Sequence, residues 1–99
     1  MKLRDKVAIV TGGARDIGRA VSVKLATEGA KVVVNYFNSQ EDANQTLREV
    51  EAVGGEAILV KGDMTKQEDV DRLVAESVAA YGKRVDVLVN VVGGLVARK

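Results

Sequence analysis

The segment of this chain best suited to bind a ligand is a glycine-bearing stretch, Thr-Gly-Gly-Ala-Arg-Asp-Ile-Gly, at residues 11–18. It follows a short apolar run and precedes an amphipathic one, so it is expected to join a strand to a helix. Glycine allows a positive φ and close approach of a ligand, and a helix N-terminus presents unpaired N–H groups and a positive dipole end. The placement predicts a phosphate-binding loop, although neither Gly-x-Gly-x-x-Gly nor the P-loop pattern is matched.

The composition excludes several other chemistries. The 99 residues include no His and no Cys, which removes the Ser-His-Asp triad, thiol nucleophiles and the usual zinc sites, so we expect no metal. The net charge is +1 and the basic residues form no long run, so we expect no nucleic-acid partner. No apolar run approaches the roughly 18 residues of a membrane span. We therefore expect a cytoplasmic protein with no membrane contact and no secretory signal.

Short apolar runs alternate with longer amphipathic ones along the whole chain. The apolar runs predict strands that are buried on both faces, and apolar residues at helical spacing predict helices. Strands are expected at residues 7–10, 32–36, 57–60 and 85–89, and helices at 17–28, 39–53 and 65–81.

Polar residues at the expected helix starts predict caps. Ser39 is expected to be the N-cap of the second helix. Thr65 and Glu68 match a capping box, which predicts Thr65 as the N-cap of the third. The apolar stripe of that helix is Val70, Leu73, Val74, Ser77, Val78 and Tyr81.

The order of elements predicts an α/β fold, a Rossmann-type doubly wound parallel sheet with its four strands in the order 3-2-1-4. The first two helices are expected on one face and the third on the other, with the ligand site between strands one and four. The fourth strand is expected to be an unpaired edge, and one face has a single helix. We therefore expect residues 1–99 to be the truncated, N-terminal part of a larger dinucleotide-binding domain. A small domain that covers this surface by oligomerising is the alternative.

Four motifs in order resemble the short-chain dehydrogenases/reductases. Thr-Gly-x-x-x-x-Ile-Gly-Arg-Ala resembles the family's cofactor loop, whose pattern is T-G-x-x-x-G-x-G. Residues 31–36 resemble the second strand, residues 62–65 the turn after the third, and residues 85–90 the strand that leads into N-N-A-G. All 99 residues resemble the N-terminal cofactor half. The Val-Val-Val-Asn-Tyr strand is most similar to reductases of 3-oxoacyl chains on a carrier protein, and sugar and secondary-alcohol dehydrogenases are similar over the same half. The resemblance implies hydride transfer between a nicotinamide and a carbonyl or secondary alcohol.

The resemblance also implies cofactor contacts. Asp63 accepts from the adenine amine, the backbone N–H of Met64 donates to the ring, and Asn90 lies near the cofactor ribose. Alternatively, Asp63 is a turn residue and Asn90 ties adjacent loops together. The predicted cofactor-binding residues are Gly12, Arg15, Asp16, Ile17, Gly18, Tyr36, Asn38, Ser39, Asp63, Met64, Asn90 and Gly93.

Two departures from the family pattern affect this prediction. Asp16 stands at the position of the middle glycine, where its carboxylate either caps the following helix or repels the cofactor pyrophosphate. Val91 and Val92 stand at the positions of Asn and Ala, where they either crowd the nicotinamide ribose or fill the core.

The residues near the second strand favour NADP(H) over NAD(H). An NAD ribose needs an acidic acceptor at the end of this strand, and residues 31–40 contain none. A 2′-phosphate instead suits a guanidinium, which Arg15 supplies in the glycine loop; the alternative is that Arg15 is a solvated surface charge.

No catalytic residue of the family is found in this chain. The family's general acid/base lies in Tyr-x-x-x-Lys, whereas Tyr36 is followed four residues later by Gln40, and Tyr81 by Val85. One hypothesis is the cofactor half of an NADP(H)-dependent carbonyl reductase, inactive alone and a homo-oligomer when complete. The other is a dinucleotide-binding module without catalysis. A methyltransferase is disfavoured, because Thr11 stands where an acidic residue is usual.

Overall fold

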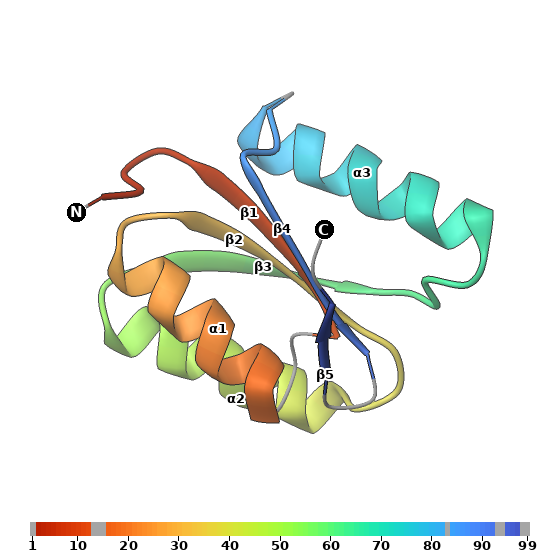
Figure 1. The fold of residues 1–99 in the computed structure, drawn as a ribbon, viewed down its shortest axis with the longest axis horizontal. Coiled ribbons are helices and arrows are strands. Elements are labelled where there is room, and N and C mark those ends of the chain that lie inside the picture. The colour runs from red at the N-terminus through yellow and green to blue at the C-terminus, as the bar shows by residue number, and fades with distance from the viewer. Residues whose placement is uncertain (1, 13–15, 83, 93–94, 98–99) are drawn as a thin grey trace.

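The computed structural model describes residues 2–12, 16–82, 84–92 and 95–97. Its elements are β1 (Val7–Thr11), α1 (Asp16–Thr27), β2 (Lys31–Tyr36), α2 (Gln40–Ala52), β3 (Glu56–Lys61), α3 (Gln67–Tyr81), β4 (Val87–Val92) and β5 (Leu95–Ala97). A single sheet separates α1 and α2, on one face, from α3 on the other (Figure 1). Within the described ranges, no helix combines the length and apolar character that crossing a membrane requires.

The sheet has the strand order β3-β2-β1-β4-β5. The pairings of β2 with β3, β1 with β2 and β1 with β4 are all parallel, so the predicted order 3-2-1-4 and the α/β fold are confirmed. Because these four strands are parallel, their carboxyl ends lie at the same edge of the sheet. The connections reverse direction between β1 and β4, which is where ligands bind in doubly wound sheets.

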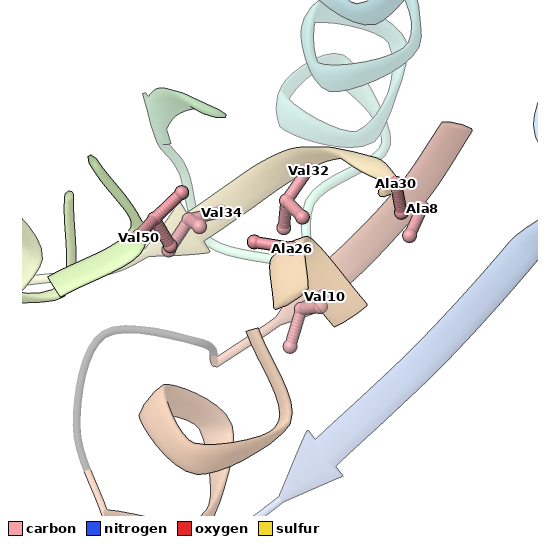
Figure 2. Packing of buried hydrophobic residues seen from close by; sticks show 7 residues of the cluster. All are labelled: Ala8, Val10, Ala26, Ala30, Val32, Val34 and Val50. Atoms are coloured by element: carbon pink, nitrogen blue, oxygen red, sulfur yellow. The ribbon is translucent and has the colours of Figure 1, made fainter. Parts of the chain in front are cut away.

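Each face of the sheet has its own core. Alternate residues of β1 and β2 pack under α1 and α2, in a cluster that consists of Ala8, Val10, Ala26, Ala30, Val32, Val34 and Val50. Figure 2 shows their side chains coming from β1, β2, α1 and α2, with Ala30 from the segment that precedes β2. The intervening residues Ile9 and Val33 pack on the other face with Val60 and with Leu73 of α3. This alternation explains why the strands are apolar along their whole length.

The helix starts differ from the predicted ones in detail. Ser39 is the N-cap residue of α2, as predicted, but its hydroxyl donates to Asp42 Oδ2 at 2.5 Å and caps no backbone group. The prediction that Thr65 caps α3 is wrong, because α3 begins two residues later, at Gln67, with Lys66 at the N-cap. Thr65 is instead held in the preceding turn, where its hydroxyl donates to Asp63 at 2.7 Å.

The fourth strand also differs from the prediction. β4 begins at Val87 rather than residue 85 and continues to Val92, and β5 pairs antiparallel with its last three residues. The expectation that the fourth strand is an unpaired edge is therefore wrong for Asn90, Val91 and Val92, which pair with β5. Two runs of β-prone residues separated by Gly-Gly are a hairpin signal that the sequence reading did not use.

Candidate dinucleotide-binding site

A pocket of about 380 Å³ lies at the carboxyl ends of the parallel strands. Its lining residues are Thr11, Gly12, Asn35, Phe37, Gly62, Asp63, Met64, Thr65, Asn90 and Val91. They come from β1, β2 and β4 and from the segments that follow β1, β2 and β3. The pocket is therefore at the position where the topology predicts a ligand, and it contains four of the predicted cofactor residues.

The ends of β1 and β4 are joined by side chains at this pocket. Thr11 and Asn90 are partners in the strand register, and the Thr11 hydroxyl donates to Asn90 Oδ1 at 2.6 Å. The hydroxyl oxygen of Thr11 also lies 3.5 Å from the carbonyl of Val89. Asn90 thus ties two strands together and lines the pocket at the same time.

Gly12 has a conformation and a neighbour that exclude a side chain. Its φ is +67°, in the left-handed region that favours glycine. A Cβ at this position would lie 2.6 Å from the carbonyl oxygen of Val91. The glycine loop therefore starts in direct contact with the end of β4.

Asn35 is a residue of this site that the sequence reading missed. Its side chain is buried at the end of β2, with 3% of the residue exposed. Oδ1 accepts from the Gly12 N–H at 3.2 Å, while Nδ2 donates to the carbonyls of Gly62 and Val60 at 3.1 and 3.2 Å. A polar residue inside an otherwise apolar strand was the signal that could have found it.

The turn after β3 presents one carboxylate to the pocket. Asp63 Oδ1 accepts from the hydroxyl and from the N–H of Thr65, and these bonds hold the pKa of Asp63 below its ordinary value. Among the described residues, no donor reaches the second carboxylate oxygen of Asp63, Oδ2, and the backbone N–H of Met64 has no acceptor. An ionised acceptor beside a free N–H matches the amine and ring nitrogen of adenine.

The same turn is braced from α3. The Asp63 N–H donates to Asp69 Oδ2 at 2.8 Å, a bond that also holds the pKa of Asp69 below its ordinary value. A Cβ on Gly62 would lie 3.1 Å from the guanidinium of Arg72 and 3.3 Å from Asp69. Close packing thus fixes the backbone that carries Asp63.

The conformation of Asp16 at the start of α1 tests the prediction that its carboxylate caps this helix. Asp16 is the first residue of α1, and its φ of +53° lies in the left-handed region. An N-cap residue has an extended conformation, so Asp16 does not have the geometry of a cap. Ile17 is partly exposed, Gly18 is buried, and Arg15 and Gly93 lie outside the described residues.

The predicted residues from the end of β2 lie outside the pocket lining. The ring of Tyr36 packs with Ala43 and Leu59, and its hydroxyl donates to Gln40 Oε1 at 2.5 Å. Asn38 is exposed and the hydroxyl of Ser39 is bonded within α2. Phe37, the first residue after β2, does line the pocket and is 57% exposed.

Comparison with known proteins agrees with this geometry. Residues 6–99 match the family described as short chain dehydrogenase. The chain belongs to this family. This short-chain dehydrogenase sequence is 41% identical to the short-chain dehydrogenase/reductase homolog YusS of Bacillus subtilis over 90 residues. The aligned region covers 91% of this chain and 82% of that relative.

Solved structures show the same relationship. A dehydrogenase/reductase from Sinorhizobium meliloti is 40% identical with a TM-score of 0.87, over 93% of this chain and 36% of that one. A hydroxysteroid dehydrogenase from Escherichia coli is 34% identical with a TM-score of 0.86, and the match covers 94% of this chain and 39% of that one. A Burkholderia cenocepacia dehydrogenase solved with bound NADP is also 34% identical with a TM-score of 0.86, and the match covers 93% of this chain and 36% of that one. The chain thus spans a little over a third of these structures and corresponds to the N-terminal Rossmann part of the family.

Proposed function

We propose that this chain binds NADP(H) for a short-chain oxidoreductase that reduces a ketone or oxidises a secondary alcohol. The observation that supports this most directly is the pocket at the β1–β4 switch point, where Gly12 and Asp63 lie on opposite loops. Gly12 leaves the backbone open to a phosphate, and Asp63 offers an ionised acceptor to adenine. The cofactor, when bound, supplies or accepts the hydride; these residues bind and orient its adenosine part.

The end of β2 favours NADP(H) over NAD(H). Asn38 and Ser39 follow the strand, and the first carboxylates after it are Glu41 and Asp42 in α2. Asp42 accepts from Ser39 and pairs with Arg19 at 3.4 Å, so it is already engaged within the protein. With no acidic acceptor before α2, a ribose 2′-hydroxyl has no carboxylate partner here, whereas Arg15 supplies a guanidinium for a 2′-phosphate.

Catalysis needs residues that this sequence does not contain. Hydride transfer to a ketone requires a proton donor near the carbonyl oxygen, and neither Tyr36 nor Tyr81 has a Lys four residues later. Tyr81 is a poor donor as well, because burial raises its pKa to about 12. We therefore propose that the chain alone binds the cofactor without turnover; a 3-oxoacyl substrate for the complete enzyme follows from the family resemblance.

The surroundings of the sheet support two further parts of this proposal. Within the residues that the structure describes, only the last three of β4 have a partner in β5. Self-association would cover the remaining edge, and we propose a homo-oligomer. The absence of Cys from the sequence suits a reducing compartment, and we propose a cytoplasmic location.

The test compares two dinucleotides on two arginine variants. NADPH and NADH are titrated by nucleotide fluorescence into the wild-type chain and into the Arg15→Ala and Arg4→Ala variants. Arg4 precedes β1, at the end of the sheet away from the pocket. We expect Arg15→Ala to weaken NADPH binding much more than NADH binding, and Arg4→Ala to change neither. Equal losses for both dinucleotides would refute the 2′-phosphate role, and carbonyl reduction by the chain alone would refute the non-catalytic role.

A further inference from the structure

We propose that Asn35 is a positioning residue that sets the glycine loop and the adenine-side turn at a fixed separation. The proposal rests on the dinucleotide-binding function above. The two segments are 50 residues apart in sequence and meet only at the carboxyl edge of the sheet, where Asn35 touches both. Its Oδ1 accepts from the Gly12 N–H at 3.2 Å and its Nδ2 donates to the Gly62 carbonyl at 3.1 Å.

The side chain acts where the backbone ladder has stopped. The register between β1 and β2 ends at the pair Val10 and Val34, so Asn35 has no partner in that ladder. Beyond this point the strands separate and the pocket begins. On the β1 side, Asn35 Oδ1 takes the place of the missing backbone pairing by accepting from the Gly12 N–H. On the β3 side, where the ladder continues to the pair Tyr36 and Lys61, Nδ2 adds a side-chain bond to the Gly62 carbonyl.

Only a carboxamide meets both sides of this gap. One side presents a donor, the Gly12 N–H, and the other presents two acceptors, the carbonyls of Gly62 and Val60. An ionised aspartate in place of Asn35 keeps the first bond and loses every bond that Nδ2 donates, which include one to the Tyr36 carbonyl at 3.4 Å, and leucine loses them all. Because the residue is buried, water cannot replace the lost partners.

The glycines at the two ends of this bridge transmit the position of Asn35. A side chain at either glycine would meet close neighbours, the Val91 carbonyl at Gly12 and Asp69 and Arg72 at Gly62. The Gly62 N–H also donates to the Tyr36 carbonyl at 2.8 Å. The residue after Gly62 is Asp63, which faces the pocket. A loop that is fixed before the ligand arrives loses less conformational entropy on binding, so Asn35 raises the affinity by holding the two loops in place.

The experiment uses the whole 99-residue chain and three variants. Asn35→Leu removes every polar contact at similar volume, and Asn35→Asp keeps the acceptor for Gly12 alone. Val33→Ala, in the same strand and also fully buried, destabilises the core without touching either loop and is the matched control. The readouts are NADPH affinity at a temperature where each variant is folded, and hydrogen exchange of the Gly12 amide relative to strand amides.

We expect Asn35→Leu to weaken NADPH binding by about tenfold or more, which corresponds to about 1.4 kcal/mol, and to speed exchange at Gly12. Asn35→Asp is expected to weaken NADPH binding and to retain protection at Gly12, and it keeps the test decisive if the leucine variant does not fold. Val33→Ala is expected to leave both readouts near wild type.

Unchanged exchange at Gly12 in Asn35→Leu would overturn the proposal, and so would an equal loss of affinity in Val33→Ala. A wild-type chain that binds no dinucleotide would refute the proposed function instead. The exchange comparison would then still decide whether Asn35 positions the glycine loop.

Discussion

The substitution Gly12→Ala tests how the glycine loop starts, because two separate penalties meet at this residue. The φ of +67° is unfavourable for any residue with a Cβ, at about 1–2 kcal/mol. The new methyl group would also lie 2.6 Å from the Val91 carbonyl oxygen, and displacing packed backbone costs about 1–3 kcal/mol. We therefore expect Gly12→Ala to lower the free energy of unfolding by about 2–5 kcal/mol and to weaken NADPH binding.

Gly54→Ala is the matched control for this prediction. Gly54 has a φ of +81°, but no atom lies within 4 Å of the position of its Cβ. It follows α2 at the end of the sheet away from the pocket, so only the conformational penalty of about 1–2 kcal/mol applies. Urea unfolding and NADPH titration of both variants measure the difference. Equal losses of stability would refute the contact with Val91 as a constraint, and normal NADPH affinity in Gly12→Ala would refute the role of Gly12 in the site.

Three further predictions concern charge and burial. The substitution Asp16→Asn removes a charge beside the predicted pyrophosphate, and asparagine tolerates the positive φ at this position. We expect it to strengthen NADPH binding by about fivefold, and we expect this gain to shrink as the salt concentration rises. No gain in affinity at low salt would contradict repulsion between Asp16 and the pyrophosphate. The pKa of Asp86 is held below its ordinary value, first by a hydrogen bond from Arg84 and then by one from the backbone N–H of Val7. Ionised Asp86 therefore stabilises the fold at any pH above its unfolded-state pKa of about 3.9. This stabilisation is lost as the pH falls through the lower pKa of the folded state. Asp86→Ala should therefore flatten the dependence of the urea midpoint on pH between about 4 and 2, and an unchanged slope would count against this pairing. Among the described residues, Ser22 and Ser77 each bury a hydroxyl that has no hydrogen-bond partner. Alanine at either position should therefore raise the free energy of unfolding by about 1 kcal/mol. A lower thermal unfolding temperature in either variant would indicate that its hydroxyl makes a hydrogen bond.

The strand order could be predicted because the relevant signals are local and repetitive. Each parallel strand is buried on both faces, so its apolar run is visible in the sequence, as at Val32–Val34. The start of α3 could not be predicted from the capping box, because two partners compete for the same side chain. The hydroxyl of Thr65 bonds to Asp63 in the turn, and that turn is fixed from outside by Asp69.

The site could be predicted only in part, for a similar reason. The motif residues Gly12, Asp63 and Asn90 meet at one pocket, and their spacing along the chain is enough to place them at strand ends. Successive side chains of a strand point to opposite faces, so the site residues of β2 could be chosen only once its two faces were assigned to the helices and to the pocket. Tyr36 is thus directed into the packing with Ala43, whereas its unpredicted neighbour Asn35 faces the pocket.

The pocket is also continuous with an apolar groove of about 440 Å³ on the α3 face of the sheet. Thr11, Met64 and Asn90 line both spaces, and Leu88 and Val74 leave 53% and 47% of their surface exposed in or beside the groove. Any group that covered this groove would remove apolar surface from water and would form a wall of the dinucleotide pocket at the same time. On the proposed function, we therefore expect the affinity of this chain for NADPH to depend on the loops that Asn35 and Asp69 brace, and the position of the nicotinamide to depend on what covers the groove.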